Sequence, residues 1–192
     1  MRHGEPIGGR KYRGQIDDPL SEKGWAQMRE ALGEHRPWSR IVSSPLLRCR
    51  AFAEELACRH QIPLRLDERL KEVGFGAWEG KSAAQLNEED PRQLPRFKAD
   101  PVNARPRGAE PLTDFFQRVA SGVEDLLDEE AHQLVICHAG VIRMVMAHAL
   151  HIPLENAYRI EVPGAGLTRI AYETGRPVRA SLRFHGARSF PG

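Results

Sequence analysis

The chain has 192 residues, 41% of them hydrophobic and 28% charged, with a formal net charge of +2. These values are ordinary for a soluble globular protein with one substantial core. So small a net charge argues against nucleic acid or an anionic membrane as a partner, although a local cluster of basic residues could bind an anion. The N-terminus has no apolar signal region and no stretch approaches a membrane span, so we expect no membrane partner.

The cysteines point to a reducing compartment. Cys49, Cys58 and Cys137 are odd in number and have no Cys-x-x-Cys spacing. We therefore expect no disulfide framework, no structural zinc and a cytoplasmic location. No metal or cofactor is expected on the grounds of the chemistry set out below. The oligomeric state cannot be read from the sequence, and a homodimer is left open.

Predicted helices and strands alternate along the chain, which favours a three-layer α/β fold. Helices are expected over residues 21–35, 46–60, 112–130 and 139–151. Strands are expected over residues 39–44, 63–70, 133–137, 158–162, 167–173 and 178–185, the last three at least partly antiparallel.

Local signals refine three of these helices. Ser21 is expected to cap the first, and Ser44, followed by a proline, the second. In the third, Phe116, Val119 and Val123 should share one apolar stripe with Leu126. Residues 82–111, rich in proline, hold two short helical pieces, so we predict one domain over residues 1–192 with an insertion or lid there.

Two passages share one pattern, in which a buried strand ends, a turn of small residues follows and a helix begins. The first carries Arg48 and the second His138. In open α/β sheets, ligands bind outside the carboxyl ends of the strands, where helix N-termini favour anions. The pattern therefore predicts an anion site that includes both side chains.

Six segments, taken together and in order, resemble the histidine phosphatase superfamily, the phosphoglycerate-mutase-like enzymes. They are RHGE, YRGQIDDPLSEKG, SSPLLRCR, LKEVGFGAWEG, RGAEP and CHAGVIR, within residues 2–143. Within the superfamily, IVSSPLLRCRAFAEEL and FGAWEG look closest to α-ribazole-5′-phosphate phosphatases of cobalamin biosynthesis. The resemblance implies an α/β/α sandwich with a mostly parallel central sheet.

The resemblance also implies catalytic roles. His3 would attack phosphorus and form a phosphohistidine, while Arg2, Arg48 and His138 bind the phosphoryl oxygens. Glu72 would protonate the leaving oxygen and later deprotonate water. The chemistry agrees, because arginine donates to two phosphate oxygens at once and adjacent cations keep an imidazole neutral.

Each candidate also has a simpler interpretation. Arg2 and His3 could be a disordered chain end, Arg48 a solvated helix residue and His138 a buried structural histidine. Glu72 could cap its glycine-rich turn, and Glu79 is a rival acid.

Three other residues could suggest different chemistry. His148 and His151 could share a metal, but no third ligand is evident and a place on the helix surface is favoured. Cys137 beside His138 could be a nucleophile, although a buried structural thiol fits its strand better.

The sequence departs from the family pattern near its start. Pro6 and Gly9 stand where many members have Thr and Asn, so one phosphate contact is missing unless backbone amides of the glycine turn replace it. By family position, Arg13 and Gly14 should line the substrate entrance. Only Met1 precedes the Arg-His pair, so the first strand is expected to be truncated and His3 poorly anchored.

These features predict a metal-independent phosphatase acting on a small-molecule phosphate monoester, with α-ribazole 5′-phosphate as one candidate. A mutase is less favoured, because the insertion is short and no tail closes the site. A non-catalytic phosphate- or partner-binding module is the alternative from another class. An aromatic wall for α-ribazole could come from Tyr12, Phe75, Trp78 and Phe97, although these rings could equally be core.

Overall fold

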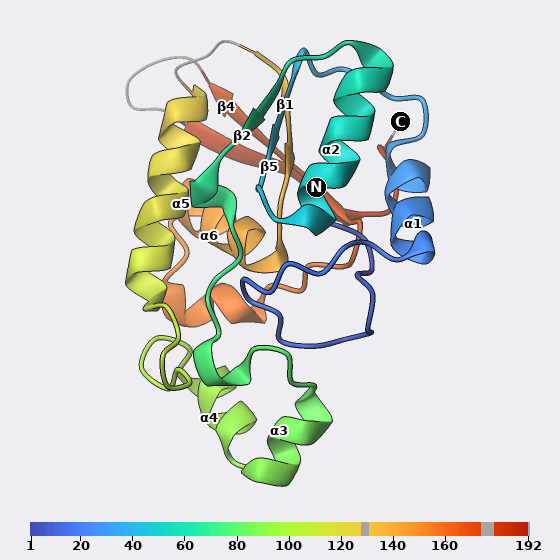
Figure 1. The fold of residues 1–192 in the computed structure, drawn as a ribbon. Helices are drawn as coiled ribbons and strands as arrows, with labels where there is room; N and C mark the ends of the chain where they lie inside the picture. The colour runs from blue at the N-terminus through green and yellow to red at the C-terminus, as the bar shows by residue number, and fades with distance from the viewer. Residues whose placement is uncertain (128–130, 174–178, 192) are drawn as a thin grey trace.

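The computed structural model describes residues 1–127, 131–173 and 179–191, and helices and strands alternate along it (Figure 1). The helices are α1 (Glu22–Leu32), α2 (Leu47–His60), α3 (Ala83–Glu89), α4 (Gln93–Ala99), α5 (Leu112–Leu127) and α6 (Ala139–Leu150). Short 3-10 helices are η1 (Glu68–Leu70), η2 (Gly76–Trp78) and η3 (Leu154–Arg159). The strands are β1 (Arg40–Ser43), β2 (Leu64–Leu66), β3 (Gln133–Ile136), β4 (Leu167–Glu173) and β5 (Arg179–Ala187). Within these described ranges, no helix is both long and apolar enough to cross a membrane.

The central sheet is parallel, with the strand order β2-β1-β3. Ser43, the last residue of β1, is paired with Leu66 of β2 and with Ile136 of β3. The carboxyl ends of all three strands therefore lie at one edge, as the strand–turn–helix pattern predicts. β4 and β5 form a separate antiparallel pair, which confirms the antiparallel expectation for the C-terminal strands.

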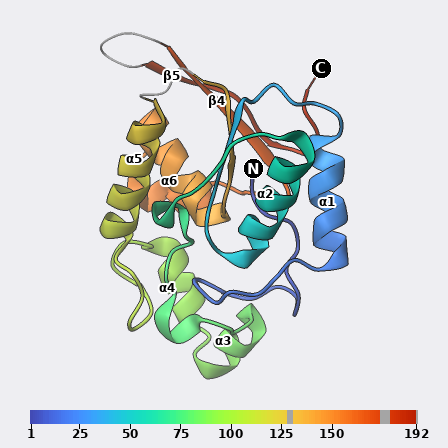
Figure 2. The same cartoon turned by 45° about the horizontal axis from the view of Figure 1, so that its top comes forward.

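Helices cover both faces of the sheet, which confirms the predicted three-layer architecture (Figures 1 and 2). Successive residues of a strand point to opposite faces. Ile41 packs into a core cluster with residues of α1 and α2, whereas Val42 packs into a second cluster with residues of α5 and α6. Both side chains are fully buried.

The first three residues extend the sheet beside β3. The amino group of Met1 donates to the carbonyl of Val135 at 2.7 Å, and its carbonyl accepts from the amide of Cys137 at 2.9 Å. The amide of His3 donates to the Cys137 carbonyl at 2.9 Å, and the His3 carbonyl accepts from Ala165 at 3.1 Å. Residues 1–3, which we call the N-terminal stub, form a single parallel bridge, Arg2 with Cys137, rather than a full strand. Their backbone is nevertheless hydrogen-bonded on both sides, to β3 and Cys137 on one side and to Ala165 and Gly166 on the other. The expectation that His3 would be poorly anchored is therefore wrong.

Two glycines bring the stub against α1. A Cβ on Gly4 would overlap the backbone of Gly24, and a Cβ on Gly24 would overlap the backbone of Glu5. Only residues without a side chain allow the two segments to approach so closely. The close contact of Gly4 with Gly24 thus fixes the position of His3, which lies between this contact and the sheet.

Residues 82–111 form the predicted insertion, with α3 and α4 projecting at one end of the molecule (Figure 1). The insertion has no core of its own. Leu86, Leu94 and Phe97 are buried and join the cluster that α5 and α6 share with Val42. It therefore packs as an extension of the domain.

Two local predictions were wrong, and the predicted apolar stripe of α5 is confirmed. On that stripe Val119 and Val123 are buried, Phe116 and Leu126 pack against the same cluster, and Phe115 is fully buried beside them. No strand forms over residues 158–162, which lie in the described part of the chain; η3 ends at Arg159, and the following carbonyls accept from the side chains of Arg143, His185 and Arg2. Ser44 does not cap α2, whose N-cap is Leu46.

Other boundaries agree better. Ser21 caps α1 by accepting from the amide of Gly24 at 3.0 Å, as predicted. The expected strand over residues 63–70 is shorter, because η1 follows β2. Residues 128–130 at the end of one predicted helix, and residue 178 at the start of the last predicted strand, lie outside the described residues.

Candidate active site

The five predicted catalytic residues converge at the carboxyl edge of the sheet. His3 is the last residue of the N-terminal stub, Arg48 lies in the first turn of α2, and His138 is the N-cap of α6, two residues after the end of β3. Glu72 lies in the loop after η1 and accepts a hydrogen bond from the first turn of α6. Arg2 precedes His3 in the same stub, where its backbone bridges Cys137 and its side chain donates to the carbonyl of Val162. The arrangement excludes a disordered end for Arg2 and His3 and a solvated position for Arg48.

The His3 ring is held in one tautomer. Its Nδ1 atom lies 2.7 Å from the carbonyl oxygen of Gly4. Because a carbonyl can only accept, the ring proton is on Nδ1 and the lone pair is on Nε2. The side chain is 7% exposed, and burial lowers its pKa well below the ordinary value, assisted by the charges of Arg48 and Arg2. His3 is therefore a neutral imidazole whose Nε2 atom has no hydrogen-bond partner among the described residues.

His138 lies next to His3, with the ring centroids 5.2 Å apart in an edge-to-face arrangement. It is fully buried, and burial lowers its pKa well below the ordinary value, followed by the effects of Arg48 and His3. Its Nε2 atom lies 2.7 Å from the hydroxyl of Ser44 and 3.6 Å from the thiol of Cys49. A second neutral histidine thus stands beside the first.

The two arginines bring buried positive charge to the histidines. Arg48 is 1% exposed and donates to the carbonyls of Ile16 at 2.7 Å and Gly14 at 2.8 Å. Arg2 donates to the carbonyl of Val162. The Nε groups of both guanidiniums are buried and find no acceptor among the described residues. Buried donors that lack acceptors beside a cationic centre favour an anion as the ligand.

Glu72 accepts backbone hydrogen bonds through both carboxyl oxygens. Oε1 accepts from the amide of Val73 at 3.0 Å, and Oε2 accepts from the amide of Gly140 at 3.2 Å. Gly140 lies in the first turn of α6, so the carboxylate sits at the positive end of a helix dipole. Its charge also acts on the pKa values of both Arg2 and Arg48. Glu72 therefore faces the same centre as the two guanidiniums.

Glu79, the rival acid, is engaged elsewhere. Its Oε1 atom accepts from the amides of Phe75 at 2.9 Å and Gln15 at 3.2 Å. It joins two loops, residues 12–16 and 72–80, through their main chains. This geometry favours a structural role for Glu79 and leaves Glu72 as the acid of the centre.

Arg13 and Gly14 hold the loop that lies over the site. The Arg13 guanidinium donates to Asp18 at 2.9 Å and to the carbonyl of Gly9 at 2.6 Å, and it is 8% exposed. Gly14 offers its carbonyl to Arg48. The charge of Arg13 reaches His3, so the loop lies near the centre, although the guanidinium is occupied by the loop itself.

The four aromatic side chains suggested as a substrate wall pack mainly against one another. Phe75, Trp78 and Phe97 are buried, and the Trp78 and Phe97 rings lie 5.2 Å apart. Tyr12 is half-buried and packs edge-on against Phe75 at 5.2 Å. Three of the four are therefore core, and only Tyr12 keeps part of its ring exposed.

Alternative chemistry finds little support in the described parts of the chain. They contain no group of three or more His, Cys, Asp or Glu side chains that could hold a metal ion. His148 lies 3.9 Å from Glu124 and 6.2 Å from the Phe116 ring, as expected for the surface of a packed helix. Cys137 is buried, and burial raises its pKa to about 11, which suits a structural thiol rather than a nucleophile.

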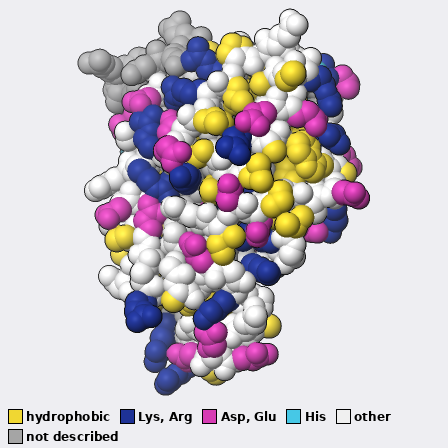
Figure 3. All heavy atoms as spheres, in the orientation of Figure 1, with side chains coloured by type: hydrophobic (Ala, Val, Ile, Leu, Met, Phe, Trp, Pro, Cys, Tyr) yellow, Lys and Arg dark blue, Asp and Glu magenta, His cyan; other side chains and the backbone are white. Residues whose placement is uncertain are grey.

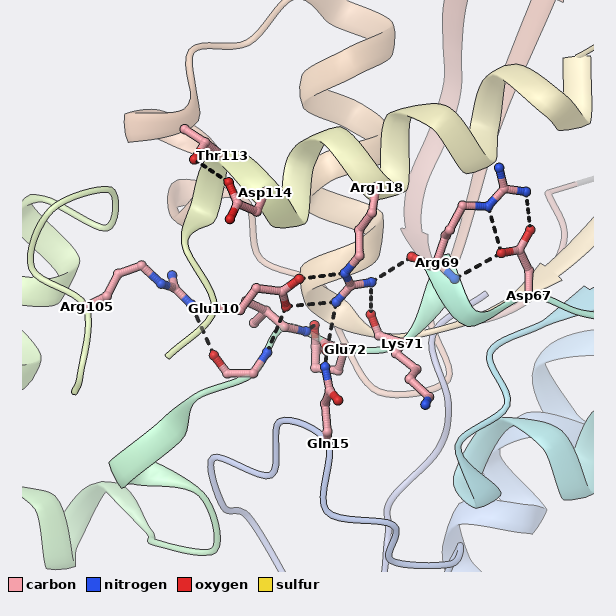
Figure 4. Close-up of polar contacts among 12 residues, drawn as sticks. Gln15, Asp67, Arg69, Lys71, Glu72, Arg105, Glu110, Thr113, Asp114 and Arg118 are labelled. Atoms are coloured by element: carbon pink, nitrogen blue, oxygen red, sulfur yellow. Dashed lines mark hydrogen bonds and ion pairs between the residues drawn. The ribbon is translucent and has the colours of Figure 1, made fainter. Parts of the chain in front are cut away.

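Sequence reasoning missed three residues at the site. Ser44 contacts His138, and an Arg118–Glu110 pair holds the main chain around Glu72 (Figure 4). Two of them, Ser44 and Glu110, stand within segments that were matched to the family, SSPLLRCR and RGAEP. Arg118 gave no local signal, since an arginine in an amphipathic helix is normally solvated.

The centre can bind a tetrahedral anion and attack it. Two guanidiniums supply fixed positive charge, a neutral imidazole supplies a nucleophilic nitrogen, and a carboxyl group can exchange protons. These are the groups that transfer of a phosphoryl group requires. Outside this centre, basic and acidic side chains are intermixed on the face shown in Figure 3, in line with the small net charge.

Comparison with known proteins agrees with this geometry. A bifunctional protein of Mycobacterium tuberculosis is 33% identical over 175 residues, which are 88% of this chain and 48% of that protein. The chain thus spans about half the length of that relative. The adenosylcobalamin/alpha-ribazole phosphatase of Salmonella typhimurium is 29% identical over 169 residues, covering 84% of this chain and 83% of that one.

The fold is also shared with solved structures. That of mycobacterial glucosyl-3-phosphoglycerate phosphatase with VO3 matches with a TM-score of 0.85 at 29% identity, over 97% of this chain and 96% of the other. This likeness confirms the predicted phosphoglycerate-mutase-like fold. A family model of the "histidine phosphatase superfamily (branch 1)" matches residues 1–184, nearly the whole chain. With its paired histidines and arginines at the carboxyl edge of the sheet, the chain belongs to branch 1 of the histidine phosphatase superfamily.

Proposed function

We propose that this protein is a phosphomonoesterase that hydrolyses a small phosphate monoester through a phosphohistidine on His3. The observation that carries the proposal is the state of the centre itself. A neutral imidazole with a free Nε2 atom lies beside two buried guanidiniums whose Nε donors find no acceptor among the described residues. The phosphoryl group of a monoester would supply those acceptors and place its phosphorus near the imidazole.

In the first step, Nε2 of His3 attacks phosphorus and the bond between phosphorus and the leaving oxygen breaks. The protonated carboxyl group of Glu72 gives its proton to that oxygen, so the alcohol departs neutral. Arg2 and Arg48 neutralise the equatorial oxygens, whose charge must be stabilised in the transition state. The Nδ1 proton stays in its hydrogen bond to the Gly4 carbonyl, which stabilises the charge that the ring gains.

In the second step, water attacks the phosphohistidine. The Glu72 carboxylate takes a proton from that water, the bond between phosphorus and Nε2 breaks, and inorganic phosphate leaves. His3 is again neutral and Glu72 again protonated, so the cycle closes. The positive charge comes from arginines throughout, and the proposal includes no metal ion.

His138 would stabilise the phosphoryl group beside His3, since the two rings are neighbours. The Ser44 hydroxyl accepts from the amide of Leu46 at 3.3 Å and lies against Nε2 of His138. If the hydroxyl donates to that nitrogen, the ring proton is on Nδ1 and is available to a phosphoryl oxygen. Arg13 and Gly14 are proposed to shape the substrate entrance through the loop that they hold.

The names of the relatives suggest substrates to test. The Salmonella relative is named for α-ribazole phosphate and the mycobacterial structure for glucosyl-3-phosphoglycerate. We include α-ribazole 5′-phosphate as one candidate, although the burial of Phe75, Trp78 and Phe97 leaves little aromatic surface for its base. A panel that adds phosphoglycerates, sugar phosphates and nucleoside monophosphates would identify the class.

A chromogenic phosphate ester separates turnover from mere binding. We expect the wild type to release phosphate from 4-nitrophenyl phosphate in the presence of a chelator. His3→Ala should abolish this release, whereas His132→Ala, at an exposed histidine, should leave it unchanged. A wild type as inert as His3→Ala would instead favour a non-catalytic binding module, which the unusual Pro6 and Gly9 would fit. Transfer of phosphate to a second substrate rather than to water would indicate a mutase.

A further inference from the structure

Arg118 lies on α5, and its side chain extends from the helix toward the loop that carries Glu72 (Figure 4). The loop, residues 69–74, begins within η1 and belongs to no strand. Main-chain groups outside regular structure must find other partners when they are buried. The position of the Glu72 carboxyl group therefore depends on what holds this loop.

Arg118 uses all of the donors that a guanidinium has. Nε donates to Glu110 Oε1 at 2.6 Å, and Nη2 donates to Glu110 Oε2 at 2.9 Å. The remaining bonds go to three main-chain carbonyls of the loop: Nη1 donates to the carbonyls of Arg69 at 2.7 Å and Lys71 at 2.8 Å, and Nη2 to that of Glu72 at 3.2 Å.

Glu110 completes the arrangement from the other end of the loop. Its Oε2 atom accepts from the amide of Gly74 at 3.1 Å, and its own amide donates to the Gly74 carbonyl at 3.0 Å. Glu110 comes from the end of the insertion and Arg118 from α5. Together they bond the main chain on both sides of the Glu72 side chain, at residues 69–72 and at Gly74.

We propose that Arg118 and Glu110 are positioning residues that hold the Glu72 carboxyl group in line with the leaving oxygen. The bidentate bond to Glu110 pairs the Arg118 charge, although that charge still contributes to the lowered pKa of His138. The guanidinium contacts Glu72 only through its backbone carbonyl, so the proposed effect on the Glu72 carboxyl group is geometric. A displacement of about 1 Å in a catalytic group can cost about a hundredfold in rate.

The proposal predicts which substitutions would no longer hold the loop main chain in place. Lysine keeps the charge but replaces the planar fork with a single ammonium group, so Arg118→Lys cannot span three carbonyls and a carboxylate. Glu110→Gln keeps the size of the side chain but has only one acceptor oxygen, so it cannot accept from both Arg118 nitrogens and from Gly74. Both variants should let the loop move while the histidines and Arg48 stay in place.

The experiment rests on the proposed function and compares two leaving groups. An alkyl phosphate needs a proton on its leaving oxygen, whereas 4-nitrophenolate departs without one. We expect Arg118→Lys and Glu110→Gln to lower kcat/KM for the alkyl ester by about a hundredfold. For the nitrophenyl ester, we expect a loss of less than about threefold, because nucleophilic attack by His3 is intact. A purely structural defect would lower both values equally.

A double-mutant cycle and a control make the result specific. Glu72→Gln should show the same selective loss, and adding Arg118→Lys to it should cause little further loss on the alkyl ester. Arg29→Lys is the control, because Arg29 forms a bidentate bond with Glu55 at 3.3 and 2.7 Å, joining α1 and α2 away from Glu72. It should affect both esters alike and slightly.

Two outcomes would overturn the positioning role: equal losses on the two esters, or losses that add in the double variant. Thermal denaturation identifies variants that do not fold, and Glu110→Gln then replaces Arg118→Lys in the cycle. Failure of the proposed function looks different. In that case the wild type would release no phosphate from either ester, or His3→Ala would release as much.

Discussion

The amide of Gly140, in the first turn of α6, donates to Oε2 of Glu72 at 3.2 Å, and the carboxyl group lies so close that residue 140 has no room for a side chain. A Cβ on Gly140 would overlap Oε1 of Glu72. The helix that carries His138 at its N-cap therefore also receives the carboxyl group of the centre. The acid and the second histidine are thereby held by one helix end.

This contact predicts the effect of a single methyl group. Gly140→Ala should displace the Glu72 carboxyl group and lower kcat/KM on an alkyl phosphate by about 10- to 100-fold. Gly122→Ala on α5 is the matched control, because a Cβ there would meet its nearest neighbour, in Arg69, at 3.5 Å. That change should leave activity intact and raise the free energy of unfolding by up to about 1 kcal/mol. Full activity in Gly140→Ala would contradict the placement of Glu72.

Substitution of the two glutamates of the glycine-rich loop, Glu72 and Glu79, should affect kcat to very different extents. Glu72→Gln removes the group that exchanges protons and should lower kcat on an alkyl phosphate by about 10²- to 10⁴-fold. Glu79→Gln keeps an oxygen for the amides of Phe75 and Gln15, so its kcat should stay within about tenfold of the wild type. Steady-state kinetics of both variants decide the assignment, and a larger loss in Glu79→Gln would reverse it.

The free energy of unfolding should decrease as the pH is lowered through the weakly acidic range. Burial lowers the pKa values of His3 and His138 in the folded protein, whereas in the unfolded chain both titrate near about 6.5. Below that pH the unfolded state binds more protons than the native state, so protonation favours unfolding. Each histidine contributes up to about 1.4 kcal/mol per pH unit.

Urea denaturation between about pH 7.5 and pH 5.5 measures this slope, above the range in which most carboxylates titrate. His3→Gln and His138→Gln should each reduce it. A free energy of unfolding that does not change between these two pH values would show that the histidines are not buried as neutral groups.

The three thiols should differ in reactivity. Cys58 is exposed, whereas Cys49 and Cys137 are buried, and burial raises the pKa of Cys49 well above its ordinary value and that of Cys137 to about 11. Only thiolates react rapidly with a disulfide reagent. We expect one fast thiol in the native protein, absent in Cys58→Ser, and all three after unfolding. A fast reaction in native Cys58→Ser would place a thiolate near His138.

Much of the site was predictable because its residues lie at fixed places in strand–turn–helix units. Arg48 and His138 follow buried strands, and parallel pairing of β1 with β3 brings such ends to one edge. The alternation of apolar residues predicted most helices and strands. The strand expected over residues 158–162 failed, because side chains of Arg143, His185 and Arg2 take the carbonyls that a neighbouring strand would have used.

The sequence by itself determined the family and the layered architecture and supplied the candidate histidines, arginines and acid, because these depend on short local patterns in a fixed order. Only the tertiary structure decided that backbone hydrogen bonds to Cys137 and Ala165 hold His3, that Glu72 rather than Glu79 accepts from Gly140 of α6, and that Arg118 bonds the main chain of the loop. Such facts rest on hydrogen bonds between segments far apart in the chain. A local sequence pattern does not predict these hydrogen bonds, because the partner of a carbonyl or a guanidinium is set by the packing of the folded chain.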